Sequence, residues 1–114
     1  MKLYSGTIFW IEGDFRKGLL GNTYAKADVS RAILDDNILK INHEYNSDVE
    51  SGLTVLRTKD GYHYDGSMTY LDEQKYSAVV NLKLFSNKNQ VLLIGCSIED
   101  GIKYDCIVEL NEVI

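Results

Sequence analysis

Residues 76–85 read YSAVVNLKLF, and their alternation decides the fold class. Ser77, Asn81 and Lys83 share one parity, whereas the residues of the other parity are all apolar: Tyr76, Ala78, Val80, Leu82 and Leu84. Successive side chains of a β-strand point to opposite faces of the sheet, so this pattern is typical of a strand with one face in the core. We expect a strand with one solvent-exposed face here.

The same alternation runs through the last part of the chain. One predicted strand carries its apolar residues at Leu92, Ile94, Cys96 and Ile98. The next carries them at Ile102, Tyr104, Cys106, Val108 and Leu110. A three-residue loop, Glu99-Asp100-Gly101, keeps both sets on the inner face and places glycine last, where a type I turn with a G1 bulge needs positive φ. In this register the two cysteines are buried, diagonal to each other and reduced.

Four further segments read as strands: residues 3–11, 38–45, 53–58 and 62–70. Lys59-Asp60-Gly61 joins the last two in a hairpin whose loop has either two or three residues. Residues 24–34 fit a strand or one helical face, and the strand is favoured because residues 34–38 resemble a tight hairpin turn. The segment 46–52 is acidic and small, which indicates a connecting loop.

About eight strands with short connections leave no room for the crossovers that parallel pairing requires. The fold class expected is therefore all-β, an antiparallel up-and-down meander forming a closed or flattened barrel, similar in architecture to the calycins. A closed form also protects the apolar face and the two edges of such a meander. With 114 residues, of which 45% are hydrophobic, the chain suits a single domain, 1–114.

Seventeen acidic residues against twelve basic ones give a formal net charge of −5. The average surface therefore repels phosphate backbones, and a nucleic-acid partner is not expected. No apolar run approaches the length of a membrane-spanning helix, and the first residues lack the pattern of a secretion signal. We expect a cytoplasmic protein with no membrane partner.

Three tyrosines, Tyr62, Tyr64 and Tyr70, share parity with Gly66 and Met68. Tyrosine is common in strands and fills cores, but a tyrosine-lined face also suits a ligand pocket or a protein interface. Gly66 leaves a gap beside the aromatic rings, which would let a ligand enter. These tyrosines are therefore candidate ligand- or partner-binding residues.

His43 and Trp10 complete the candidate binding residues. His43 shares the apolar face of its strand, whereas His63 lies opposite the tyrosines and is expected in solvent. No spacing of histidine, cysteine or carboxylate residues fits a metal site, and no nucleophile has a histidine placed beside it. The sequence predicts neither catalytic residues nor a cofactor nor a metal.

Two functions fit these features. The first is a non-enzymatic binding protein that neutralises a basic partner protein, as an immunity protein or antitoxin does, because acidic surfaces steer basic partners. The alternative is a calycin-like barrel that holds a small apolar or aromatic molecule in its interior. An enzyme is the weakest of the hypotheses, because no general acid and base are paired.

Overall fold

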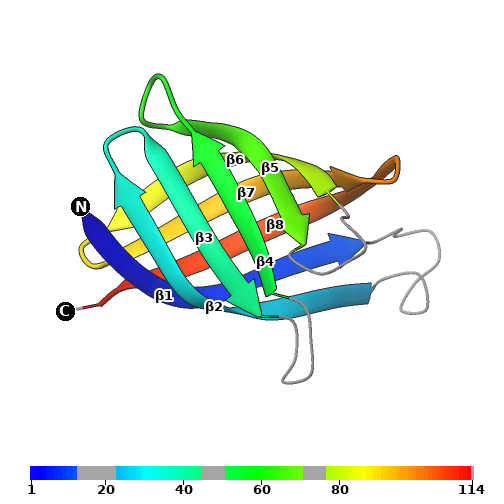
Figure 1. Cartoon of the computed structure of the whole chain (residues 1–114), viewed down its shortest axis with the longest axis horizontal. Helices are drawn as coiled ribbons and strands as arrows, with labels where there is room; N and C mark the ends of the chain where they lie inside the picture. The colour runs from blue at the N-terminus through cyan, green and yellow to red at the C-terminus, as the bar shows by residue number, and fades with distance from the viewer. Residues whose placement is uncertain (13–22, 45–50, 71–76, 114) are drawn as a thin grey trace.

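The computed structural model describes residues 1–12, 23–44, 51–70 and 77–113. These residues form eight strands in a closed barrel, in which each strand pairs antiparallel with the next and β8 pairs back with β1 (Figure 1). The strands are β1 (Lys2–Glu12), β2 (Thr23–Asp35), β3 (Ile38–Glu44), β4 (Ser51–Arg57), β5 (His63–Tyr70), β6 (Ser77–Asn87), β7 (Gln90–Glu99) and β8 (Ile102–Glu112). The predicted all-β meander and its closure are confirmed.

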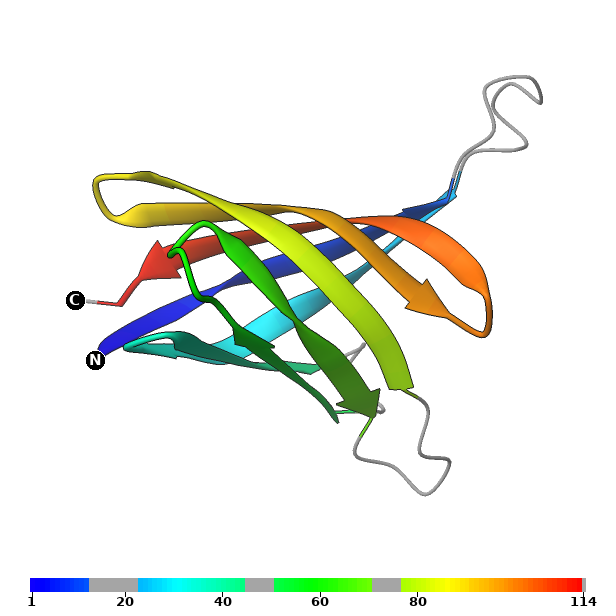
Figure 2. The same ribbon diagram turned by 90° about the horizontal axis from the view of Figure 1, so that it is seen from above.

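The barrel is flattened, with extents of 42 × 32 × 25 Å (Figure 2). Both ends of the chain lie at the same end of the barrel, beside the β2–β3, β4–β5 and β6–β7 connections. We call this the proximal end, and the end where β1, β3, β5 and β7 finish the distal end. None of the described residues belongs to a helix that could cross a membrane.

Apolar side chains fill the interior of the barrel. On β6 the predicted inward residues Ala78, Val80 and Leu82 are buried, and on β3 so are Leu39 and Ile41. Tyr45 and Tyr76, predicted on the same faces, lie outside the described residues, as do residues 46–50 of the predicted loop. The last two residues of that loop instead begin β4.

The strand predicted over residues 24–34 is confirmed as β2, and a bulge explains why its pattern resembled a helix. The register shifts at Ser30 against both neighbours, because Val29 pairs with His43 while Arg31 pairs with Asn42. An extra residue in one strand switches the inward parity. The inward residues of β2 accordingly run Ala25, Ala27, Val29 and then Ala32 and Leu34.

The predicted inward face of β7 is wrong. That set comprised Leu92, Ile94, Cys96 and Ile98. In the structure Val91, Leu93 and Ser97 are buried, whereas Ile94 and Ile98 are exposed. Both faces of β7 carry large apolar residues, so alternation has no power to select the inner face.

The three-residue loop predicted for the last hairpin is also wrong, because it was chosen to keep the wrong face of β7 inward. Asp100 and Gly101 form a two-residue turn with φ values of 51° and 77°, the positive values that a type I′ turn requires. Cys96 therefore pairs with Asp105 on the outer face and is partly exposed, while Cys106 is buried as predicted. Both cysteines are free and lie on opposite faces of the hairpin, and their reduced state stays a prediction.

The β4–β5 connection is longer than either predicted loop. Arg57 pairs with Asp65, so the residues between them form the connection and the first residues of β5. The even-numbered residues of both strands face inward, among them Thr54, Leu56 and Tyr64. The register left open by the sequence is thereby fixed.

Candidate functional site

Three of the predicted binding residues gather at the distal end. Trp10 lies near the end of β1, His43 near the end of β3, and Tyr70 is the last residue of β5. The ring centroids of Trp10 and His43 are 5.6 Å apart with the planes tilted by 60°. Gly52 on β4 pairs with both His43 and Tyr70, so it lies between them in the sheet.

Gly52 makes room for the imidazole of His43. A Cβ atom added at this glycine would come within 2.3 Å of His43 Nε2, closer than any side chain tolerates. The imidazole therefore packs directly over the backbone of β4. The sequence singled out His43 and not Gly52, because their proximity depends on the β3–β4 register.

His43 is a buried polar group without a partner. Its exposed fraction is 1%, and neither Nδ1 nor Nε2 has a hydrogen-bond partner among the described residues. Nearly all buried polar side-chain atoms in folded proteins are hydrogen-bonded, because leaving one unpaired costs about 1–3 kcal/mol. This imidazole therefore carries a cost that the fold itself does not explain.

Burial lowers the pKa of His43 to about 4. The imidazole is therefore neutral near pH 7, with one ring nitrogen acting as donor and the other as acceptor. No nearby charge contributes to this shift, which indicates an apolar environment. A ligand group that accepts or donates a hydrogen bond would find an unused partner here.

A small cavity lies in the barrel interior next to the distal group of Trp10, His43 and Tyr70. Ile41 and Thr54 pair with each other one inward-facing row from His43 and Gly52, and both line the cavity. Trp10 and Met68 line it as well. Its volume is about 10 Å³, which is close to the least that holds one water molecule.

Charged side chains are absent from the described part of the interior. The buried polar residues among those described are His43, Thr54, Thr58 and Ser97. An uncompensated charge is costly in such surroundings, because burial removes its hydration. The interior is therefore suited to uncharged groups, and no cluster of three potential metal ligands exists among the described residues.

Tyr64 and Tyr62 do not belong to the distal group. Tyr64 is buried at 4% exposure within the core, with its phenol pKa raised by burial. Tyr62 precedes β5 and is 39% exposed, and its ring meets those of His63 and Phe85 edge to face. The expectation that Tyr62 shares the inner face with Tyr64 is wrong, because strand alternation does not extend back to this residue.

The gap predicted beside Gly66 is also absent. A Cβ atom at Gly66 would lie 1.9 Å from the carbonyl oxygen of Val55. The glycine is required because the backbone of β4 approaches closely at this point. It leaves no entrance for a ligand.

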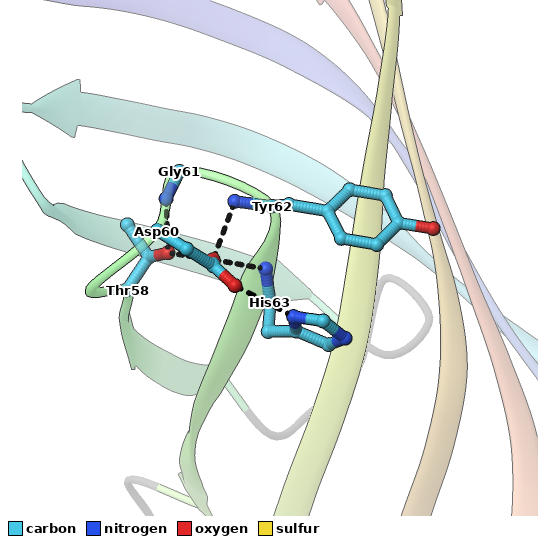
Figure 3. A network of polar contacts seen from close by, with 5 residues as sticks. All are labelled: Thr58, Asp60, Gly61, Tyr62 and His63. Carbon is cyan, nitrogen blue, oxygen red and sulfur yellow. Dashed lines mark hydrogen bonds and ion pairs between the residues drawn. The ribbon is translucent and has the colours of Figure 1, made fainter.

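Asp60 organises the β4–β5 connection on the outer surface (Figure 3). Its Oδ1 accepts hydrogen bonds from the backbone N–H groups of Tyr62 and His63, both at 2.8 Å, and from the Thr58 hydroxyl at 3.2 Å. Its Oδ2 lies 2.8 Å from His63 Nδ1. These contacts hold the pKa of Asp60 well below its usual range, with the His63 side chain as the largest cause.

His63 is exposed, as the sequence predicts, and it lines an outer groove of about 600 Å³. Arg57 and Lys59 line this groove together with Asp60 and Asp65, so its charges are mixed. The Asp60 network satisfies the turn locally, as aspartate does in many turns. The groove therefore gives weaker evidence of a site than the unpaired imidazole of His43 does.

Comparison with known proteins identifies the architecture and no family. No protein-family model matches the chain, and no curated protein matches it. Among solved structures, the chain resembles a redesigned β-barrel, mFAP1, bound to DFHBI, with a TM-score of 0.54 and 13% sequence identity. The match covers 96% of this chain and 92% of that protein. At this identity the likeness shows the barrel fold alone.

Proposed function

We propose that this protein binds a small molecule inside its barrel, at the distal end where Trp10, His43 and Tyr70 gather. The observation that carries the proposal is His43, which is buried and whose ring nitrogens have no hydrogen-bond partner among the residues that the structure describes. A ligand that pairs with this imidazole would recover the hydrogen bonds that the ligand-free fold lacks. The role remains binding without catalysis, as predicted from the sequence.

Support for an interior ligand also comes from the architecture. Eight-stranded barrels are either filled by side chains or hold one small ligand. The barrel mFAP1, which this chain resembles in fold, was solved bound to DFHBI. The cavity lined by described residues measures only about 10 Å³, so binding there must displace a side chain. Met68 lines the cavity and is unbranched, so it can adapt its shape most readily.

The other hypothesis, neutralisation of a basic partner protein, rests on the net charge of −5 and on exposed aromatic side chains such as Tyr62. Neither the fold nor the comparisons support it over ligand binding. It therefore stays a prediction, and a cytoplasmic location is likewise an expectation from the sequence.

Nuclear magnetic resonance with a library of single-ring compounds tests the proposal. Binding compounds should shift the methyl signal of Met68 and the indole signal of Trp10. Ala25→Leu adds bulk directly beside Trp10, since these two residues are cross-strand partners, and should abolish binding. Val79→Leu, on the outer face of β6, is the matched control and should leave binding unchanged.

Two results would contradict an interior site. In one, compounds bind the Ala25→Leu variant as well as the original protein. In the other, they shift only residues of the outer groove, such as Arg57 and Lys59. Circular dichroism of each variant would establish that the barrel is intact.

A further inference from the structure

We infer that the interior site selects an uncharged aromatic molecule that carries a hydroxyl or N–H group, and that His43 pairs with that group. This inference rests on the proposed function and specifies its ligand. It excludes purely apolar molecules as the preferred ligands, and it excludes organic ions.

The first step concerns the character of the hydrogen bond. The imidazole of His43 has no charged neighbour that shifts its titration, and the described part of the interior holds no buried charged side chain. A carboxylate or an ammonium group would enter this space without a counter-ion, which is strongly unfavourable. A neutral donor or acceptor has no such penalty, and neutral imidazole can meet either one.

The second step concerns the shape of the ligand. Trp10 presents its ring close to His43 and also lines the cavity, so a molecule pairing with His43 meets an aromatic surface. On the β4 side the imidazole packs against Gly52, where an added Cβ would lie 2.3 Å from Nε2, and Thr54 lines the neighbouring cavity. A flat ring fits between such surfaces better than a branched aliphatic group does.

The third step concerns size. An enclosed apolar cavity of about 150 Å³ holds benzene, and the present cavity of about 10 Å³ is far smaller. The largest ligand that fits is therefore one with a single aromatic ring, and it enters only if a side chain such as Met68 moves aside. Met68→Ala should enlarge the site and strengthen binding of every single-ring ligand that the site accepts.

Three probes of similar size separate the possibilities: p-cresol, toluene and benzoate. The original protein and Met68→Ala are titrated with each at pH 7, with Trp10 fluorescence and calorimetry as readouts. We expect p-cresol to bind about tenfold or more tightly than toluene, in line with one buried hydrogen bond. Benzoate should not bind.

Two variants of His43 provide the decisive comparison. His43→Phe keeps an aromatic ring and His43→Leu avoids overlap with Gly52, and both remove the unpaired nitrogens. We expect both variants to prefer toluene to p-cresol. At least one should unfold at the same or a higher temperature than the original protein, because it loses an unsatisfied polar group. His43→Gln restores a donor and an acceptor and should recover part of the preference for p-cresol.

The outcomes distinguish the inference from the proposal beneath it. If no probe binds the original protein or Met68→Ala, the interior is not a ligand site and both fail. If toluene binds as well as p-cresol, or if the preference survives in both apolar variants, the barrel binds ligands but His43 does not select them. Tight binding of benzoate would overturn the inference in favour of an anionic ligand. Marked destabilisation of both apolar variants would make His43 a structural residue instead.

Discussion

At the scale of single residues, His43 couples the stability of the barrel to pH. The pKa of a histidine in an unfolded chain is about 6.5, and burial lowers that of His43 to about 4. Between these values the unfolded chain binds a proton that the native protein does not bind. The free energy of unfolding therefore falls as the pH drops from about 6.5 to about 4, and below that range His43 has no further effect.

The expected loss is on the order of 3 kcal/mol over the whole interval. It is measured by urea unfolding at several pH values for the original protein and for His43→Leu. Titration of the carboxylates is common to both proteins. The difference between their free energies of unfolding at each pH therefore isolates the contribution of His43. Parallel curves for the two proteins would show that His43 is already protonated, or solvated, in the native state.

Tyr64 and Tyr62 differ in burial, and their truncation should differ accordingly. Tyr64→Ala should lower the free energy of unfolding by about 3–5 kcal/mol, because the exposed fraction of this core residue is only 4%. Tyr62→Ala removes a ring that is 39% exposed and should cost far less. Chemical denaturation of both variants makes the comparison, and equal losses would contradict the placement of these two rings.

At the scale of strands, sequence alternation predicts faces well where only one face is apolar. β3 meets that condition and β6 comes close to it, with Val79 and Phe85 as the apolar residues of its outer face, and their described inward residues were predicted correctly. β7 does not, because Leu92 and Ile94 on one face match Val91 and Leu93 on the other in hydrophobicity. Only the pairing with β8 decides between them, and that pairing depends on the positive φ values of a two-residue turn.

The candidate site was predictable in part for the same reason. Parity identified His43 as an inward residue, but strand order separates β3 from β1 by the whole of β2. Trp10 pairs with Ala25 and His43 with Val29 on the intervening strand, so the meeting of their rings depends on two strand registers that no local pattern encodes. The grouping of Tyr62 with Tyr64 failed because the Asp60 network interrupts the alternation.

The two faces of the β7–β8 hairpin give its cysteines different reactivity. Cys96 is partly exposed on the outer face, whereas burial raises the pKa of the Cys106 thiol to about 12. A thiol reagent at pH 8 should modify Cys96 in the native protein and Cys106 only after unfolding. Cys96→Ser is the control and should show no native reaction. Two equally fast thiols would contradict the assigned faces.

Close approach of neighbouring strands makes Gly66 intolerant of substitution. Gly66→Ala places a methyl group 1.9 Å from the Val55 carbonyl oxygen, so the two strands must separate. We expect a loss of about 3 kcal/mol in the free energy of unfolding. Gly61→Ala meets no atom within 4 Å but has a φ of +79°, and should cost only about 1–2 kcal/mol. A harmless Gly66→Ala would refute the close approach.

At the scale of the whole molecule, the pairing of the first and last strands predicts tolerance of circular permutation. Tyr4 pairs with Glu112, and the backbone N–H of Val113 donates to the Leu3 carbonyl at 2.8 Å. A short Gly-Ser linker joining the ends, with new ends between Asp100 and Gly101, should preserve every strand pair. Circular dichroism and cooperative thermal unfolding should match those of the original protein.

A second permutant, opened between Asn81 and Leu82 within β6, supplies the contrast. It divides a strand that pairs on both sides, and we expect it not to fold cooperatively. If the two permutants unfold with similar cooperativity, an intact β6 is not required for the stability of the barrel.

Closure of the barrel also determines how this chain can meet other chains. Proteins often associate by adding a strand to a free sheet edge, and amyloid growth begins in the same way. Each of the eight described strands pairs with a neighbour on both sides over most of its length, so the described barrel leaves no whole strand edge open to another chain. Recruitment of another chain by the described barrel should therefore depend mainly on side chains. Fibril formation should require a strand pair such as β1 and β8 to separate first. Its rate should therefore be limited by unfolding of the barrel rather than by the encounter of two chains.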